Sequence, residues 1–261
     1  MPTTSYTKEV VPLVRSVREM LVPFYGNTEI LRQKGDSAVT VVTELDIKIE
    51  EFFAEELKKR YPAIDFVGEE TGGNRSAEQF WLVDPIDGTS HFVRGMPFCT
   101  TMLALIEKGE VVFSVIYDFM GDVIYVAEKG KSATMNGTAI HVSKRKLAEA
   151  YISFETDLDK EENNIICHSL RSRCVLVNTI SSGFEHAMVA CGKLDGRICK
   201  DPYGKDYDYA AGSLLVAEAG GCVVNIGAAL YDYRNLNFIA ANPVIFKELT
   251  EGDGAVFPFV S

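Results

Sequence analysis

Aliphatic side chains near the start of the chain recur at the spacing of a helix. Between residues 5 and 26 they fall on one helical face, and they are Val10, Val11, Val14, Val17 and Leu21. Pro12 lies inside this pattern, so we expect an irregular first turn. Pro23 and Gly26 are expected to end the helix.

A second helix is predicted to follow Thr43. This threonine can act as the N-cap, and Asp46 stands three residues later as in a capping box. The helix should run to about Tyr61, because Pro62 follows. The side chains expected to face inward are Ile47, Phe52, Phe53 and Leu57.

Strand patterns dominate the next part of the chain. "IDFVGEE" and "FWLVDP" predict short strands that end in acids, and residues 99–128 predict further strands joined by tight turns. "ATMNGTAIHVS" predicts a hairpin with Asn-Gly at its turn. Residues 1–147 are therefore predicted to form an α+β half with a mainly antiparallel sheet.

The pattern changes after about residue 147 to alternating strands and helices. "SSGFEHAMVACG" and "YDYAAGSLLVAEAGG" predict helices that end in glycine, "NFIAAN" predicts a late strand, and "PVIFKELT" predicts a final short helix. Residues 148–261 are thus predicted to form an α/β half.

Composition narrows the classes of function. The chain has 261 residues, is 47% hydrophobic and carries a net charge of −11. This charge argues against nucleic acid or an anionic membrane as the main partner, although metal cations would permit an anionic substrate. We find neither a secretion signal nor an apolar run of membrane-spanning length. The six cysteines form no CxxC motif, so we expect reduced thiols in a cytoplasmic protein.

Carboxylates recur where strands end or helices begin. They are Asp46, Glu69, Glu70, Asp84, Asp87 and Asp208. Taken singly, each fits a local role as a helix cap, a turn residue or a solvated loop residue. Together they match the oxygen ligands that Mg²⁺ prefers. Such acids would repel one another without a cation, so a metal site explains why they recur.

The stretch "DPIDGTS" adds groups suited to phosphate. Asp84 and Asp87 can converge across a turn stiffened by proline, and the carbonyl of Ile86 offers another oxygen ligand. The amides of Gly88 and Thr89 can hold phosphate oxygens. This combination predicts metal-assisted hydrolysis of a phosphate ester.

Several motifs in order along the chain resemble those of the inositol monophosphatase family. "WLVDPIDGTSHFVRGMPF" is similar to the first family signature, and "DYDYAAGSLLVAEAGG" to the second, WDxAAGxLIVxEAGG. "VTELD", "FVGEET", "VACGKLDGR" and "FIAAN" also resemble family motifs. The matches span roughly residues 34 to 242.

The resemblance implies a role for each matching residue. Glu69, Asp84 and the Ile86 carbonyl would bind one Mg²⁺, and Asp84, Asp87 and Asp208 a second. Asp46 and Thr89 would orient and deprotonate the attacking water. Glu70 would support the water network or a third, weaker metal. Gly88, Thr89 and Ser90 would hold the phosphate.

The resemblance also implies a layered α-β-α-β-α sandwich, a homodimer and inhibition by lithium. Metal-activated water would attack the phosphorus, so no covalent phosphoenzyme is expected. His91 replaces the asparagine common in the family, and we interpret it as a structural residue.

The chain departs from the family where the substrate's alcohol is held. Ser182 and Gly183 lie in "NTISSGFEHAM", which replaces a GSAA-like helix start. Asp201 has the spacing of the family's polyol-binding glutamate, but an alignment through "KLDGR" puts Cys199 there. The same stretch carries the basic residues Arg197, Lys200 and Lys205, which would suit a second phosphate.

Alternatives therefore stay open. The leading hypothesis is a phosphomonoesterase acting on a small phosphorylated polyol or sugar. The basic stretch would also suit a fructose-1,6-bisphosphatase or a phosphatase for 3′-phosphonucleotides or NADP. A different class, a macromolecular binding or regulatory protein with the same fold, would not need the metal site, and neither would a catalytically idle subunit. The intact acids favour catalysis.

Overall fold

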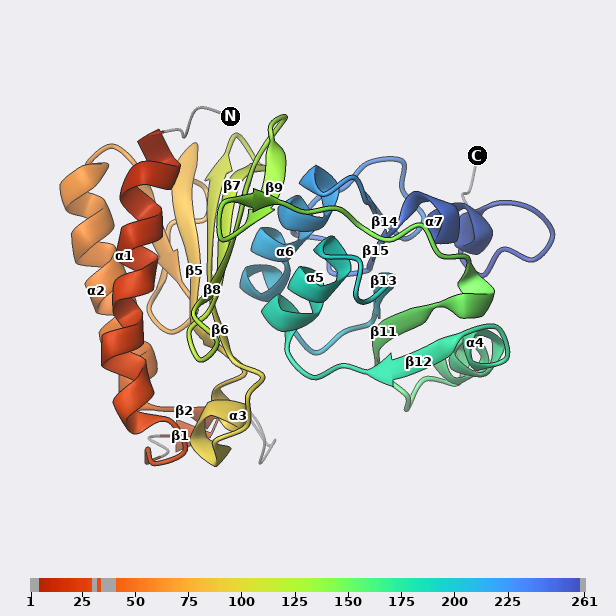
Figure 1. Ribbon diagram of the computed structural model, residues 1–261, viewed down its shortest axis with the longest axis horizontal. Helices are drawn as coiled ribbons and strands as arrows, with labels where there is room; N and C mark the ends of the chain where they lie inside the picture. Colours follow the sequence, from red (N-terminus) through yellow and green to blue (C-terminus); the bar gives the residue numbers. More distant parts are fainter. Residues whose placement is uncertain (1–4, 30–31, 34–40, 259–261) are drawn as a thin grey trace.

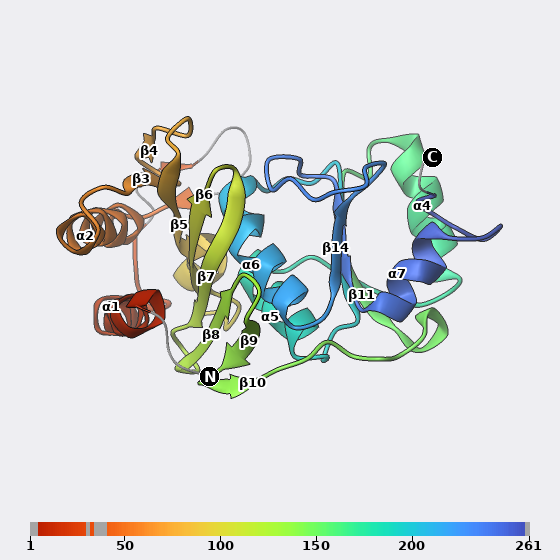
Figure 2. The same cartoon turned by 90° about the horizontal axis from the view of Figure 1, so that it is seen from above.

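The structure is a computed structural model and describes residues 5–29, 32–33 and 41–258. Helices and sheets alternate in layers (Figures 1 and 2). Two helices cover the outer face of the first sheet, two lie between the sheets, and two cover the outer face of the second. The predicted layered α-β-α-β-α sandwich is thus confirmed.

The first sheet has eight strands in the order β10-β9-β8-β7-β6-β5-β3-β4. Only β3 and β5 pair in parallel; the other pairings in this sheet are antiparallel. The strands are β3 (Asp65–Gly68), β4 (Gly72–Gly73), β5 (Gln79–Asp87), β6 (Thr100–Glu107), β7 (Glu110–Asp118), β8 (Val123–Glu128), β9 (Ser132–Met135) and β10 (Thr138–Ala139).

Two helices pack on the outer face of this sheet, α1 (Ser5–Leu21) and α2 (Glu44–Arg60). Their apolar faces join the sheet in one buried cluster that includes Val14, Phe53 and Trp81. The prediction of an irregular first turn at Pro12 is wrong, because α1 continues through this residue. Pro12 lies on the exposed side, where water can bond the carbonyl that the proline leaves unpaired.

The capping prediction for α2 is confirmed. Thr43 is the N-cap, and a capping box with Asp46 is present. Of the side chains expected inward, Phe53 and Leu57 are buried. Ile47 and Phe52 are only half-buried, and Ile49 is buried instead.

The second sheet has five strands in the order β12-β11-β13-β15-β14. β11 runs parallel to both β12 and β13, and β15 pairs antiparallel with β13 and β14. The strands are β11 (Tyr151–Thr156), β12 (Val175–Asn178), β13 (Gly196–Lys200), β14 (Cys222–Asn225) and β15 (Phe238–Ala241).

The layer between the sheets consists of α5 (Ser182–Ala190) and α6 (Asp206–Glu218). Both helices share a buried cluster with strands of both sheets, so the two halves pack as one body around them. The outer helices α4 (Glu161–Arg171) and α7 (Pro243–Thr250) cover the far face of the second sheet. The division at residue 147 into two domains stays a prediction.

The remaining elements are short. They are the helix α3 (Thr89–Arg94), the 3₁₀ turns η1 (Val22–Phe24) and η2 (Leu147–Glu149), and the strand pair β1 (Arg32–Gln33) and β2 (Val41–Val42). Within the described ranges, no helix is both long and apolar enough to cross a membrane.

Candidate active site

Three carboxylates from two layers of the fold meet at one point. Asp84 and Asp87 belong to β5, and Asp208 lies in the first turn of α6. Each offers one oxygen, and these oxygens lie within 4.8 Å of one another. They meet at a cavity of about 570 Å³, which Asp87 and Asp208 help to line.

A bulge in β5 lets two residues three positions apart face the same centre. Asp84 pairs with Met102 and Asp87 with Thr100, so β5 has one more residue here than β6. In a regular strand, residues three apart point to opposite faces; the extra residue turns Asp87 back to the side of Asp84. The structure thus forms a bulged strand where the sequence predicted a turn.

Glu69 reaches the same centre through the parallel pairing of β3 with β5. Gly68 lies opposite Val83, which places Glu69 next to Asp84. The Glu69 amide donates to the Val83 carbonyl at 3.1 Å. The four acids predicted as metal ligands therefore come together.

The carboxylates strongly perturb one another. Burial raises the pKa of Asp84 well above its ordinary value, and the charges of Glu69, Asp87 and Asp208 raise it further. Burial, followed by Asp87, likewise raises the pKa of Asp208. Oδ1 of Asp84 is buried with no hydrogen-bond partner among the described residues. This set of oxygens fits a hard divalent cation. Such a cation would be bound by Oδ1 of Asp84 and would cancel the repulsion among the carboxylates.

Asp46 and Thr89 form a dyad beside this centre. Oγ1 of Thr89 lies 3.0 Å from Oδ1 of Asp46 and 2.9 Å from the Ile86 carbonyl oxygen. The amide and hydroxyl of Thr43 both donate to Oδ2 of Asp46 at 2.7 Å. These bonds fix the carboxylate so that Oδ1 faces Thr89. Burial raises the pKa of Asp46, while the bonds from Thr43 oppose that shift.

Asp87 is held by donors at the start of α5. The Gly183 amide donates to its Oδ2 at 2.7 Å, and the Ser182 amide to its Oδ1 at 3.3 Å. The hydroxyls of Ser181 and Thr100 also donate to Oδ2, at 2.6 and 3.1 Å.

This network changes the roles expected for Ser182 and Gly183. Ser182 lines the cavity, but its hydroxyl donates to the Asp208 carbonyl at 2.6 Å. Gly183 is not among the lining residues. A β-carbon there would lie 2.2 Å from the Thr100 hydroxyl, so glycine permits the close approach. Both residues thus support acids of the carboxylate cluster, Asp87 and Asp208.

Gly88 and Ser90 line the cavity as expected. Gly88 has φ of +83°, and a β-carbon there would lie 2.5 Å from the Phe98 carbonyl oxygen, so only glycine fits this turn. His91 also lines the cavity; burial lowers its pKa, which favours the neutral ring.

Glu50, which the sequence did not single out, organises the loop after β3. It is fully buried, and its carboxylate accepts the amides of Glu70 at 2.9 Å and of Thr71 at 2.7 Å. Glu70 lies close enough to Asp46 for its charge to raise the pKa of that carboxyl. This places Glu70 near the dyad; its role in the water network or at a third metal stays a prediction.

Two residues of the predicted substrate rim lie elsewhere. Asp201 is not among the lining residues; its carboxylate binds Lys160 at 2.8 Å, and Asn163 and Lys200 at 3.0 Å. We therefore do not retain Asp201 as a polyol-binding residue. Lys200 forms an ion pair with Asp201 and does not line the cavity, whereas Lys205 lines it.

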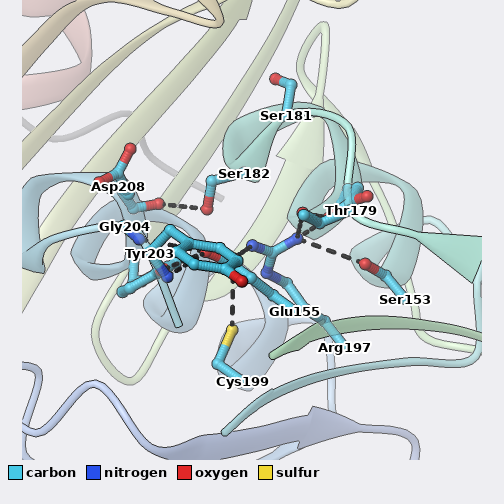
Figure 3. Close-up of polar contacts among 12 residues, drawn as sticks. Ser153, Glu155, Thr179, Ser181, Ser182, Arg197, Cys199, Tyr203, Gly204 and Asp208 are labelled. Atoms are coloured by element: carbon cyan, nitrogen blue, oxygen red, sulfur yellow. Dashed lines mark hydrogen bonds and ion pairs between the residues drawn. The ribbon is translucent and has the colours of Figure 1, made fainter. Parts of the chain in front are cut away.

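Three further buried charges lie beside the cavity, and Figure 3 labels two of them, Glu155 and Arg197. They are Glu155, Glu185 and Arg197, and the first and last of them also line it. Arg197 belongs to the basic stretch that suggested a second phosphate, but its ion pairs with Glu155 and Glu185 occupy it instead. No sequence motif pointed to the two glutamates.

Comparison with known proteins agrees with this geometry. The model of the inositol monophosphatase family matches residues 4–253. The chain belongs to this family. It is 33% identical to inositol monophosphatase 3 of Solanum lycopersicum over 245 residues, covering 89% of this chain and 90% of that protein.

Thermotoga maritima supplies a further sequence match and a solved structure. The fructose-1,6-bisphosphatase/inositol-1-monophosphatase is 30% identical over 243 residues, covering 92% of this chain and 93% of that protein. The solved structure of an IMPase superposes with a TM-score of 0.84 at 28% identity, covering 94% and 95% of the two chains. The present inositol monophosphatase family member is accordingly a phosphatase.

Proposed function

We propose that the chain is a Mg²⁺-dependent phosphomonoesterase that hydrolyses a small phosphorylated polyol or sugar. The observation that carries this proposal is the convergence of Asp84, Asp87 and Asp208 within 4.8 Å, beside the Asp46–Thr89 dyad. Inositol 1-phosphate is the first candidate substrate, since relatives across most of the chain are named inositol monophosphatases.

The metal ligands fall into two overlapping sets. Glu69, Asp84 and the Ile86 carbonyl would hold one Mg²⁺, and Asp84, Asp87 and Asp208 a second. Bound Mg²⁺ would offset the charge of the phosphate and lower the pKa of a water molecule. Glu70, near the dyad, would support the water network or a third ion.

The dyad would then handle the proton of the attacking water. The Thr89 hydroxyl lies within hydrogen-bond distance of both the Ile86 carbonyl and Asp46. With the Ile86 carbonyl bound to a metal, the hydroxyl would donate to Asp46, and a lone pair on Oγ1 would stay available to accept a proton from water. As Thr89 takes that proton, it passes its own to Oδ1 of Asp46. The raised pKa of Asp46 suits it to receive the proton, and the bonds from Thr43 keep it in place.

Phosphate would bind where Gly88 and Ser90 line the cavity. The glycine turn brings backbone close to the metal ligands, and backbone N–H groups in such turns favour anions. Attack by water at phosphorus forms one P–O bond and breaks the bond to the alcohol, which leaves after gaining a proton from solvent.

A second candidate substrate is a sugar bisphosphate. Arg94 and Lys205 both line the cavity, and neither forms an ion pair within the described part of the chain. A second phosphate would bind such cations. One relative is named for fructose-1,6-bisphosphatase as well as inositol-1-monophosphatase activity.

The deciding experiment is a phosphate-release screen with Mg²⁺. Its substrates are inositol 1-phosphate, fructose 1,6-bisphosphate, 3′-phosphoadenosine 5′-phosphate and NADP, and each is also assayed in EDTA. We expect release from inositol 1-phosphate that requires Mg²⁺. Absence of release from every substrate would contradict the proposal and favour a binding role. Inhibition by lithium, a homodimer and a cytoplasmic location stay predictions.

A further inference from the structure

A fully buried arginine beside the cavity pairs with two glutamates; Figure 3 shows Arg197 next to one of them, Glu155. Arg197 on β13 forms ion pairs with Glu155 of β11 and Glu185 of α5. The parallel register of the strands places Arg197 opposite Ser153, so Glu155, two residues on, lies on the same face. These three residues are called the ionic cluster below.

The first glutamate holds the loop that leads into α6. Oε1 of Glu155 accepts three donors: the amides of Tyr203 and Gly204 at 3.1 Å and the hydroxyl of Tyr209 at 2.9 Å. The next residue, Lys205, donates its amide to Oδ2 of Asp208 at 2.5 Å. Glu155 therefore fixes the backbone that orients one metal ligand.

The second glutamate holds the loop that leads into α5. Oε1 of Glu185 accepts the Ile180 amide at 2.8 Å, and Oε2 accepts the Thr179 hydroxyl at 3.0 Å. The next residue, Ser181, donates its hydroxyl to Asp87 at 2.6 Å. Glu185 therefore fixes the backbone that orients the other metal ligand.

We propose that the ionic cluster positions Asp87 and Asp208 relative to each other and thereby sets the affinity of the second metal ion. The inference rests on the proposed function. These are positioning residues rather than substrate ligands, because the donors just described already occupy both carboxylates. Arg197 links the two loops: without its charge, two carboxylates would stay buried without a cation, and the loops would move to expose them.

The decisive variant is Arg197→Lys. Lysine keeps the positive charge but lacks the planar fork that reaches two carboxylates at once. In the purified full chain, calorimetric titration with Mn²⁺ in the absence of substrate should show about tenfold weaker binding or more, the effect of losing a charge-assisted hydrogen bond. Activity should need correspondingly more Mg²⁺ and should recover at saturating Mg²⁺.

A matched control separates this role from general stabilisation. Arg145 forms an ion pair with the buried Asp195 at 2.7 Å, and neither residue lines the cavity. Arg145→Lys should lower the melting temperature and leave Mn²⁺ affinity unchanged. Equal losses of melting temperature in both variants, with wild-type Mn²⁺ affinity in Arg197→Lys, would overturn the proposal.

Two further variants decide the matter if Arg197→Lys does not fold. Glu155→Gln and Glu185→Gln keep the shape of each side chain and remove its charge. Each should weaken Mn²⁺ binding about tenfold. Unchanged affinity in both would overturn the positioning role. A wild-type chain that binds no Mn²⁺ at all would instead contradict the proposed function.

Discussion

Oγ1 of Thr89 lies 3.0 Å from Oδ1 of Asp46, although 43 residues separate the two along the chain. Asp46 sits in the first turn of α2, and Thr89 begins α3 (Thr89–Arg94) with one residue between it and the end of β5. The capping bonds from Thr43 hold the carboxylate that faces Thr89. The capping residue of α2 therefore also fixes the carboxylate of the proposed catalytic dyad.

Replacement of Thr89 by alanine tests the dyad. Thr89→Ala should lower kcat by about a hundredfold or more and change KM little, because the hydroxyl acts mainly in the transition state. Thr89→Ser, which keeps the hydroxyl, should retain most of the activity. Steady-state kinetics of both variants check this. A change in KM alone would make Thr89 a substrate-binding residue.

Neutralising Glu50 tests whether the loop carrying Glu69 and Glu70 needs its buried anchor. Glu50→Gln leaves one oxygen where two accept the amides of Glu70 and Thr71, so the loop should loosen and the Mg²⁺ needed for half-maximal activity should rise about tenfold. Glu51→Gln, at the exposed neighbouring position, should behave like wild type. Identical Mg²⁺ curves for both variants would refute the anchoring role.

The raised pKa values of Asp84 and Asp208 predict how Mg²⁺ stabilises the fold at different pH. Without metal, a carboxyl whose folded pKa is raised keeps a proton that the unfolded chain has lost. The free energy of unfolding should therefore fall as pH rises above about 4, the unfolded pKa. Mg²⁺ replaces those protons, so its stabilising effect should grow with pH.

Melting temperatures with Mg²⁺ or EDTA at pH 5 and pH 8 measure this effect. The gain from Mg²⁺ should be larger at pH 8, and Asp84→Asn should reduce the difference between the two pH values. An equal gain at both pH values in wild type would contradict the shared metal site.

The lysine that lines the cavity should discriminate between substrates if a bisphosphate is used. Lys205→Ala should lower kcat/KM for fructose 1,6-bisphosphate, because it removes one charge-assisted contact worth about 1.5–3 kcal/mol. The kcat/KM for inositol 1-phosphate should barely change. Lys200→Ala is the control, because Lys200 pairs with Asp201 outside the cavity. An unchanged ratio of the two efficiencies in Lys205→Ala would remove the second candidate substrate.

Contacts close in sequence were the ones that could be predicted. Thr43 and Asp46 form the capping box of α2 and are only three residues apart, so the local sequence pattern was enough to predict their contact. The lengths of α2 and α6 followed from periodicity and from the residues that end them. The prediction of an irregular turn at Pro12 failed because it depended on whether that residue is exposed, which the sequence does not give. Exposure decides whether water can replace the helical hydrogen bond that proline cannot donate.

Contacts set by strand register could not be predicted. Arg197 and Glu155 are 42 residues apart and meet only because β11 and β13 pair in parallel with one register. The spacing of Asp201 suggested a substrate contact, yet its φ of +50° and its bonds to Lys160 and Asn163 hold it beside α4. Spacing along the chain carries no information about such a turn.

The most direct test of the metal-dependent mechanism is the turnover of Asp87→Asn. Asparagine keeps the shape of Asp87 but removes the charge that would bind the second Mg²⁺. Phosphate release from inositol 1-phosphate should fall by about a hundredfold or more at saturating Mg²⁺, roughly 3 kcal/mol of lost transition-state stabilisation, with the circular dichroism spectrum unchanged. Turnover near that of wild type would contradict the assignment of Asp84, Asp87 and Asp208 as a catalytic metal site.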